Sequence, residues 1–128
     1  MPGKSLRPAK IIIINEFMTE FIFKKDNEGL VFVGNFNAYY AEVADPWGQS
    51  NNSETDMSEY YSYSRRHLVE KIKCLISDNK IKISEVGCGL GYVLKDMHAY
   101  FEFAELSGYD ISDVAIQKAR SLNGNVAD

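Results

Sequence analysis

The hydrophobic pattern of this chain changes along its length. From residue 81 onward, short apolar stretches alternate with segments in which apolar residues recur every three or four positions. Strands and helices that alternate with short links are typical of a parallel sheet with right-handed crossovers, so we expect an α/β fold. The pattern predicts a strand over Ile81–Val86, a helix over Tyr92–Phe101, a strand over Ala104–Tyr109 and a helix over Asp113–Leu122, with Ser112 as its N-cap.

A β-hairpin is predicted upstream of this region. Two stretches rich in β-branched and aromatic residues, Phe21–Phe23 and Leu30–Val33, flank the polar cluster Lys24–Gly29. The glycine at the end of that cluster can adopt the positive φ that a bulged hairpin loop requires. We therefore expect a hairpin over Phe21–Val33, either as a flap or as an addition to a sheet edge. The apolar run Ile11–Ile14 precedes it.

Two helices are predicted between the hairpin and residue 81. Asn35–Ala44 and Met57–Ile76 carry apolar residues at helical spacing, and the turn Asp45–Gly48 ends the first of them. The chain is thus expected to comprise three segments. These are an N-terminal extension with the hairpin (1–36), a helical cap segment (37–80) and the α/β part (81–128).

Composition and charge narrow the classes of function. Hydrophobic residues at 45% and charged residues at 25% are typical of a soluble globular protein. A net charge of −4 removes the general attraction to nucleic acids and anionic membranes, so we expect neither as a partner. Cys74 and Cys88 fit neither a disulfide framework nor a metal-binding spacing, which favours a reducing cytoplasm and predicts no metal site.

The segment Ile81–Gly91, IKISEVGCGLG, carries the first candidate chemistry. An apolar strand runs into closely spaced glycines and then a helix, which places bare backbone amides where no Cβ keeps a ligand away. The spacing departs from two phosphate-binding patterns. A dinucleotide fingerprint needs glycine where this chain has Tyr92, and a P-loop needs a GK[ST] ending that Leu90-Gly91-Tyr92 lacks. The glycines alone are equally consistent with a tight strand-to-helix turn.

Asp110 adds a second, independent feature. It follows the next predicted strand, 19 residues after Gly91. A carboxylate at the carboxyl end of that strand can accept hydrogen bonds from both ribose hydroxyls of an adenosyl group. The glycine turn together with this carboxylate therefore favours a binding site for a nucleotide-like cofactor.

Two motifs within about forty residues resemble class I S-adenosylmethionine-dependent methyltransferases. They are Glu85-x-Gly87-x-Gly89-x-Gly91 and the run that begins Asp110-Ile111-Ser112. The resemblance implies a partial Rossmann-like class I methyltransferase fold with S-adenosylmethionine as cofactor. It implies that Gly87, Cys88, Gly89 and Gly91 form the turn beneath the methionine part, that Glu85 anchors this turn or meets the amino group through water, that Asp110 holds the ribose, and that Ile111 packs on the adenine.

The upstream region is similar to the leader of small-molecule methyltransferases of the nodulation N-methyltransferase kind. Its matching stretches are Phe32–Phe36, Asp45–Gln49 and Tyr60–Arg66. The resemblance implies an N-terminal helix over the cofactor, with Tyr61, Arg65 and Trp47 as contact candidates. Asp128 is similar to the acidic residue that touches the adenine amine in the family.

Each of these single residues also has a structural explanation. Trp47 is well placed as a packing anchor for the Asp45–Gly48 turn. Arg65 lies on a predicted helix where it can face solvent, and Cys88 can act as a small buried residue beneath the glycine turn.

The resemblance implies methyl transfer to a small-molecule acceptor, for which a protein aligns donor and acceptor and excludes water. Catalytic bases in this family lie on later strands, so the catalytic residue is unknown. We expect the chain to be an N-terminal piece or a truncated relative, completed by a missing C-terminal half or by a homo-oligomer, because parallel sheets are normally covered on both faces. The alternative is a non-catalytic, degenerate methyltransferase-like module that acts through protein binding; a nicotinamide-dependent oxidoreductase is disfavoured by Tyr92.

Overall fold

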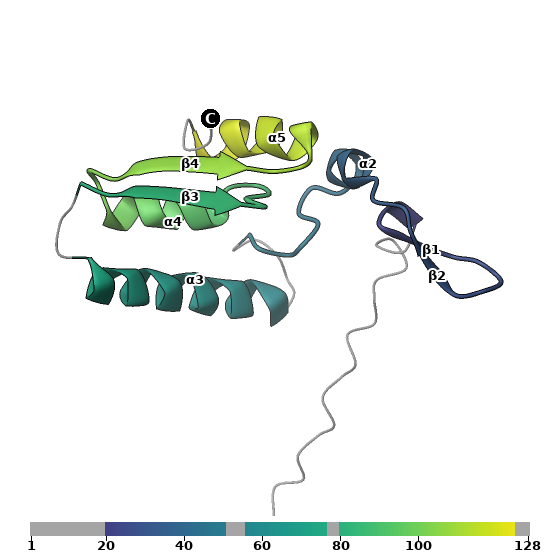
Figure 1. Cartoon of the computed structure of the whole chain (residues 1–128), viewed down its shortest axis with the longest axis horizontal. Helices are drawn as coiled ribbons and strands as arrows, with labels where there is room; N and C mark the ends of the chain where they lie inside the picture. Colours follow the sequence, from purple (N-terminus) through teal and green to yellow (C-terminus); the bar gives the residue numbers. More distant parts are fainter. Residues whose placement is uncertain (1–19, 51–55, 77–79, 125–128) are drawn as a thin grey trace, which may run out of the picture. The chain divides into compact units, whose positions relative to one another are not determined.

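The computed structural model of the chain describes residues 20–50, 56–76 and 80–124 (Figure 1). Ile11–Ile14 and Asp128 lie outside the described residues. The chain divides into two compact units, Met1–Asn35 and Phe36–Asp128, and each has its own architecture.

The first unit contains the predicted hairpin. Strands β1 (Phe23–Lys25) and β2 (Leu30–Phe32) pair antiparallel, with Phe23 opposite Phe32 and their rings edge to face at 5.6 Å. The Asp26 carboxylate closes the loop, because its Oδ1 accepts hydrogen bonds from the backbone amides of Glu28 at 2.8 Å and Gly29 at 3.0 Å. The polar cluster therefore forms the turn, as the sequence predicts.

The second unit is mixed α/β with a small parallel sheet. Strands β3 (Lys82–Val86) and β4 (Glu105–Tyr109) pair in parallel, and Val86 lies opposite Tyr109 at their carboxyl ends. Helix α4 (Tyr92–Tyr100) connects the strands, and α5 (Asp113–Asn123) follows β4. The predicted bounds of these four elements are confirmed to within one residue. Ser112 caps α5 as expected, since its Oγ accepts from the Ala115 amide at 3.1 Å.

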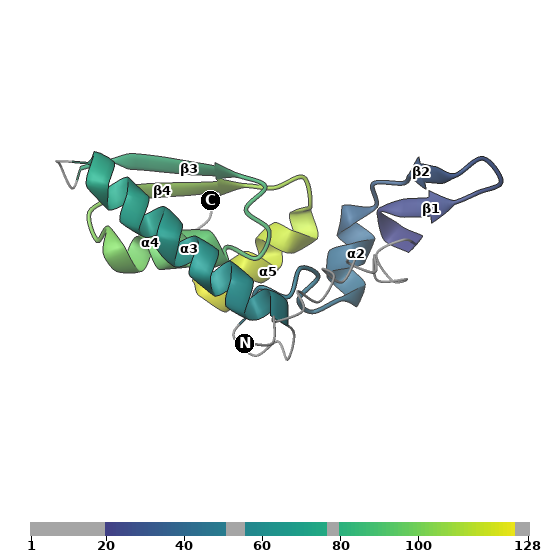
Figure 2. The same cartoon turned by 90° about the horizontal axis from the view of Figure 1, so that it is seen from below.

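Both flanking helices pack on one face of this sheet (Figures 1 and 2). Leu106 of β4 and Ile116 of α5 both pack against a buried cluster that includes Leu94 of α4. Gly108 keeps the contact close, because a Cβ there would come within 2.5 Å of Leu94 Cδ1. The strand residues therefore alternate between this covered face and an exposed one.

Helix α3 (Asp56–Leu75) lies against α4 and completes the core. Val69 of α3 and Met97 of α4 are almost fully buried, and Phe101 joins them. At roughly 25 cal/mol per Å² of apolar surface, burial of each such side chain stabilises the fold by about 1.5–3 kcal/mol. Val69 and Ile72 of α3, with Ile76 just after it, form its core-facing side, whereas Leu68 and Leu75 are 43% and 85% exposed, so the apolar stripe predicted for this helix matches that side only in part.

Helix α2 (Phe36–Glu42) packs on α5. Asn37 Oδ1 accepts from Ser112 Oγ at 2.7 Å and from the Val114 amide at 3.4 Å, so α2 contributes to the cap of α5. Lys118 Nζ donates to the Tyr40 carbonyl near the other end of α2. Contacts at both ends therefore fix α2 on α5. In the described part of the chain, no helix is long and apolar enough to cross a membrane.

Candidate functional site

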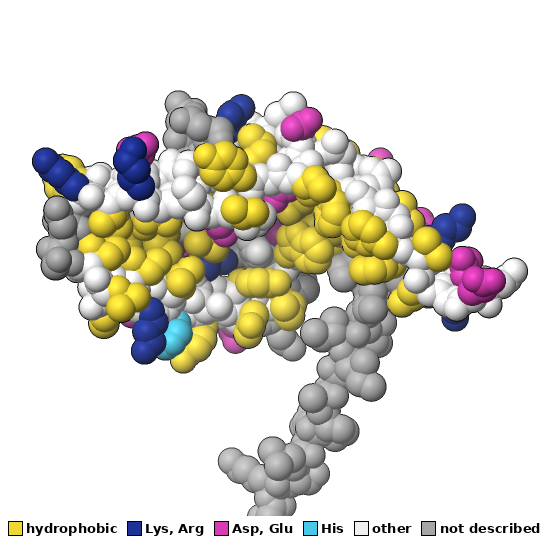
Figure 3. All heavy atoms as spheres, in the orientation of Figure 1, with side chains coloured by type: hydrophobic (Ala, Val, Ile, Leu, Met, Phe, Trp, Pro, Cys, Tyr) yellow, Lys and Arg dark blue, Asp and Glu magenta, His cyan; other side chains and the backbone are white. Residues whose placement is uncertain are grey.

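A cavity of about 490 Å³ opens where β3 and β4 end. Figure 3 shows hydrophobic side chains gathered around the hollow in this region. Its volume falls within the roughly 300–1,000 Å³ of small-molecule sites, and it occupies the strand ends where α/β folds bind ligands. Its walls are formed by Phe36, Tyr40, Trp47, Gln49, Tyr61, Glu85, Val86, Gly87, Cys88, Gly89, Tyr109, Asp110 and Ile111.

Most of the residues proposed from sequence meet at this cavity. They are Tyr61, Glu85, Gly87, Cys88, Gly89, Asp110 and Ile111, together with the leader candidate Trp47. Two lie outside the lining. Gly91 caps the N-terminus of α4 with φ +79, and Arg65 lies beneath the cavity wall with an exposed fraction of 7%.

The glycine turn is as tight as its sequence indicates. Gly87 and Gly89 have φ values of +78° and +53°, a region that L side chains rarely adopt. A Cβ on Gly89 would lie 2.8 Å from Tyr40 Oη, whereas a Cβ on Gly87 would meet nothing within 4 Å. Gly89 thus admits Tyr40 to the cavity wall.

The amides of this turn are already engaged, which differs from the expectation of bare donors. Gly87 and Cys88 both donate to the Tyr109 carbonyl, at 2.7 and 3.0 Å, and Gly91 donates to the Cys88 carbonyl at 2.9 Å. The Gly87 and Cys88 donors are thus directed at the end of β4, and the Gly91 donor at the turn itself. A phosphate group, which needs such donors, therefore fits this turn poorly.

Asp110 joins the turn to the start of α5. Its Oδ2 accepts from the Gly89 amide and its Oδ1 from the Ser112 amide, both at 2.8 Å. A carboxylate offers about four acceptor sites, so each oxygen retains one. The side chain is held in place by the backbone and still presents acceptor capacity to the cavity it lines.

Glu85 is the second carboxylate of the cavity. Its Oε2 is buried and has no hydrogen-bond partner, although buried carboxylate oxygens are normally satisfied. Burial, with a smaller contribution from the Asp110 charge, raises the pKa of Glu85 from 4.5 to about 7. An unpartnered carboxylate oxygen beside a second carboxylate indicates a site for a positively charged donor.

Tyr40, Trp47, Tyr61 and Tyr109 form an aromatic part of the cavity lining, called the aromatic wall. Trp47 Nε1 donates to Tyr40 Oη at 2.8 Å, and Tyr39 packs edge to face on Trp47 at 5.7 Å. Burial, as the main cause, raises the pKa of Tyr40 to about 12, so its phenol stays neutral. At the rim, Ile111 and Tyr109 are 78% and 56% exposed. These surfaces suit a flat apolar group such as a nucleobase.

Cys88 is a packing residue of this site. It is buried beneath the turn, and burial together with the nearby carboxylates raises the pKa of its thiol to about 11. The thiol is therefore neutral and a weak nucleophile at physiological pH, which supports the structural explanation over a catalytic one.

The sequence did not single out Phe36, Tyr40 or Gln49 as site residues. The stripe of Phe36, Tyr39, Tyr40 and Val43 does predict a helix. Only the packing of α2 on α5 determines which of these rings faces the strand ends, and a helical stripe carries no information about that partner.

Comparison of the chain with protein-family models, with curated proteins and with solved structures finds no match.

Proposed function

We propose that this cavity binds S-adenosylmethionine and that the chain carries the cofactor-binding part of a class I methyltransferase that acts on a small molecule. The main support for this proposal is that the glycine turn at 87–89 and the carboxylate of Asp110 border one cavity at the carboxyl ends of parallel strands. The Rossmann-like methyltransferase fold and a cytoplasmic location belong to the same proposal.

Asp110 would hold the ribose. Its two oxygens are oriented by the Gly89 and Ser112 amides, and each keeps an acceptor site. Two vicinal hydroxyls can donate to those sites without displacing the backbone contacts. Pre-oriented acceptors lower the ordering cost of binding.

Glu85 would take the ammonium group of the methionine part. The buried Oε2 has no hydrogen-bond partner, and a charged donor would supply one, while the amides of Gly87 and Cys88 already donate to the Tyr109 carbonyl. Because those amides are already engaged, the turn suits the proposed ligand better than a dinucleotide, whose pyrophosphate needs donors. The nicotinamide alternative is therefore disfavoured by the site as well as by Tyr92.

The aromatic wall and Ile111 would receive the adenine. Tyr61, Trp47 and Tyr109 line the cavity from three different elements or loops, and Ile111 presents an exposed apolar side chain next to Asp110. Stacking on such surfaces contributes binding energy without hydrogen-bond readout.

When bound, S-adenosylmethionine supplies an electrophilic methyl group for in-line transfer. The residues of this chain would bind and orient it, while the aromatic wall restricts the access of water. No residue is assigned to hold the methyl acceptor or to act as a catalytic base. A second copy or a further chain would supply these parts of the site.

Calorimetric titration of the chain tests this proposal. We expect heat of binding with S-adenosylmethionine and S-adenosylhomocysteine, and none with NAD. Binding of NAD alone, or of none of the three, would overturn the assignment. Binding of S-adenosylmethionine without methyl transfer to any member of a panel of small-molecule acceptors would favour the non-catalytic module.

The variant Asp110→Ala tests the ribose contact. We expect it to weaken binding by about 1–3 kcal/mol, because hydrogen bonds to a charged group are lost. Asp113→Asn is the matched control, since Asp113 is acidic, exposed, three residues away and outside the cavity lining. Equal affinities for the two variants would contradict the proposed role of Asp110.

A further inference from the structure

We infer that Arg65 is a positioning residue, which fixes the Trp47–Gln49 wall of the cavity without contacting a ligand bound there. This inference rests on the proposed function for the meaning of the cavity. Its structural part concerns the chain alone and is tested without ligand.

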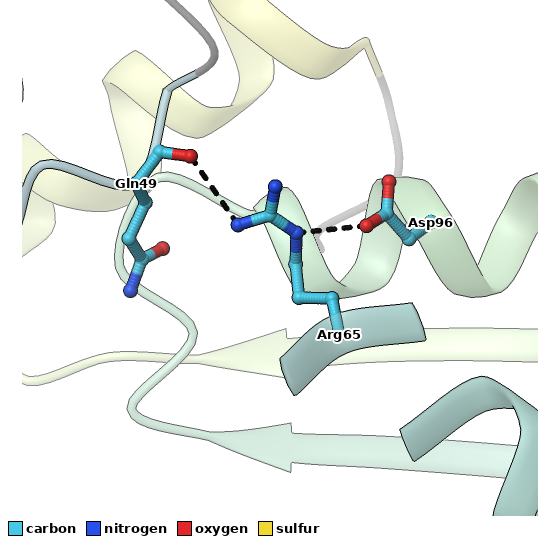
Figure 4. Close-up of polar contacts among 3 residues, drawn as sticks. All are labelled: Gln49, Arg65 and Asp96. Atoms are coloured by element: carbon cyan, nitrogen blue, oxygen red, sulfur yellow. Dashed lines mark hydrogen bonds and ion pairs between the residues drawn. The ribbon is translucent and has the colours of Figure 1, made fainter. Parts of the chain in front are cut away.

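The Arg65 guanidinium joins three parts of the second unit. It projects from α3, and its Nε donates to Asp96 Oδ2 of α4 at 2.7 Å (Figure 4). Its Nη1 donates to the backbone carbonyl of Gln49 at 3.3 Å. The guanidinium also lies 5.6 Å from the centre of the Tyr92 ring.

Because Arg65 is buried, its guanidinium depends on these contacts. Its side chain is 7% exposed, while that of Asp96 is 38% exposed. A buried guanidinium needs both charge compensation and hydrogen-bond acceptors. Asp96 provides the opposite charge, and the Gln49 carbonyl accepts a second N–H that would otherwise be unpaired.

The Gln49 contact leads directly to the cavity. Gln49 and Trp47 both line it. Both residues belong to the short Asp45–Ser50 loop. This loop is internally bonded, because the Asp45 carboxylate accepts from the amides of Gln49 at 2.9 Å and Ser50 at 2.8 Å. A shift at the Gln49 carbonyl would therefore move the loop as a unit and carry the Trp47 ring with it.

The fork shape of arginine is required for this arrangement. Nε and Nη1 address two acceptors on different elements at once. A lysine ammonium is a point charge that can remain with Asp96 but has no second donor fixed at the required angle. A lysine at position 65 should therefore preserve the ionic contact between α3 and α4. It should not hold the loop that contains Gln49 in place.

Trp47 provides a specific readout, since it is the single tryptophan of the chain. We would measure its emission maximum and its quenching by acrylamide in the ligand-free 128-residue chain. Arg65→Lys and Arg65→Ala should shift the emission and increase the quenching relative to the wild type. Arg66→Ala is the matched control, because Arg66 is the exposed neighbour on α3 and should leave both signals unchanged.

Ligand affinity separates positioning from general stability. We expect Arg65→Lys to weaken S-adenosylhomocysteine binding about tenfold, which corresponds to roughly 1.4 kcal/mol, measured well below the unfolding midpoint. Asp96→Asn keeps an acceptor for Nε and leaves the Gln49 contact in place. It should therefore lower the thermal midpoint while changing affinity and Trp47 emission less than Arg65→Lys does.

Two outcomes would overturn the inference. One is wild-type Trp47 emission and quenching in Arg65→Lys; the other is a loss of affinity in Arg65→Lys and Asp96→Asn that merely follows their loss of stability. If the wild type binds no S-adenosyl compound, the proposed function fails, and the tryptophan measurement still decides the role of Arg65. If Arg65→Ala does not fold, Arg65→Lys and Asp96→Asn carry the test.

Discussion

Two glycines of the turn, Gly87 and Gly89, share a left-handed backbone but differ in what surrounds them. Alanine at either position incurs the same kind of conformational strain, of order 1–2 kcal/mol. A Cβ at position 89 additionally collides with Tyr40 Oη, while one at position 87 points into open space. We expect Gly89→Ala to lower the free energy of unfolding by about 1–3 kcal/mol more than Gly87→Ala, as measured by urea denaturation.

The Tyr40 hydroxyl is the cause of that difference, so Tyr40→Phe serves as the control background. Removing the hydroxyl opens space for the Cβ of the Gly89→Ala variant, and the two substitutions should be less than additive. Strict additivity in the double variant would contradict the collision and place the cost in the backbone alone.

The Glu85 carboxyl predicts a pH dependence of stability. Its pKa in the folded chain, about 7, lies above its ordinary value of 4.5, chiefly because of burial. The folded state therefore binds the proton more tightly, and this group favours folding most at low pH. Its contribution is lost as pH rises from 4.5 through 7, by about 1–2 kcal/mol once solvent screening of this partly exposed group is allowed for.

Glu85→Gln isolates this effect from the other titrating groups. Gln has a similar size and stays neutral, so the difference in unfolding free energy between variant and wild type should grow in favour of the variant as pH rises from 4.5 to 7 and then level off. The comparison is made by urea denaturation at fixed ionic strength. A difference that is independent of pH would contradict the raised pKa.

The chemistry at the residue scale was predictable where it follows from chain position. Asp110 and Glu85 stand at strand ends that parallel pairing brings together, and the structure does place them on one cavity. The engagement of the turn amides was not predictable, because the Tyr109 carbonyl that accepts from Gly87 and Cys88 reaches them only through the fold.

Among the elements, α2 depends on α5 for its position. Asn37 Oδ1 is the acceptor for the hydroxyl of Ser112, a residue that is fully buried. We expect Asn37→Ala to lower the unfolding free energy by about 1–3 kcal/mol, because that hydroxyl loses its acceptor. Asn37→Asp retains an acceptor at the N-terminus of α5 and should recover part of the loss in thermal unfolding.

Tryptophan emission extends this test from stability to the site. Because α2 brings Tyr40 and, through it, Trp47 to the cavity, loosening α2 should also shift Trp47 emission. A destabilised Asn37→Ala variant with wild-type emission would show that the aromatic wall is held by Arg65 and the Asp45–Ser50 loop without help from α2.

The limits of the helices and strands were predictable from sequence to within about two residues, because they follow from local signals. Asp45–Gly48 ends one helical pattern, Ser112 caps another, and the glycines at 87–91 mark the change from strand to helix. The contacts between elements carry no such signal. Arg65 on α3 and Asp96 on α4 are 31 residues apart, and the sequence around each one predicts only an exposed charged residue.

At the scale of the molecule, the two faces of the sheet differ. The face away from α4 and α5 carries an ion pair, Lys82–Glu105 at 2.7 Å with both side chains more than two-thirds exposed, and a hydrogen bond of 2.9 Å between Ser84 and Ser107. Parallel sheets covered on both faces have apolar residues at these positions. At residues 82–85 the outward side chains of this face are polar, whereas Val86 at the end of the same strand is apolar and 88% exposed.

Lysine substitutions at two neighbouring positions of β3, one on each face of the sheet, test this difference. Ser84→Lys adds a charge to the polar face and should change the unfolding free energy by no more than about 0.5 kcal/mol, without altering sedimentation behaviour. Ile83→Lys places the same group against the Val69–Met97 cluster and should destabilise the chain by several kcal/mol or prevent folding. If a second copy or another segment covers the polar face, Ser84→Lys would also be strongly destabilising, and loss of that cover would appear as a lower sedimentation coefficient. A tolerated Ser84→Lys would instead confine any completing partner to the outer edges of β3 and β4, which pair with no further strand among the described residues and where a partner could extend the sheet.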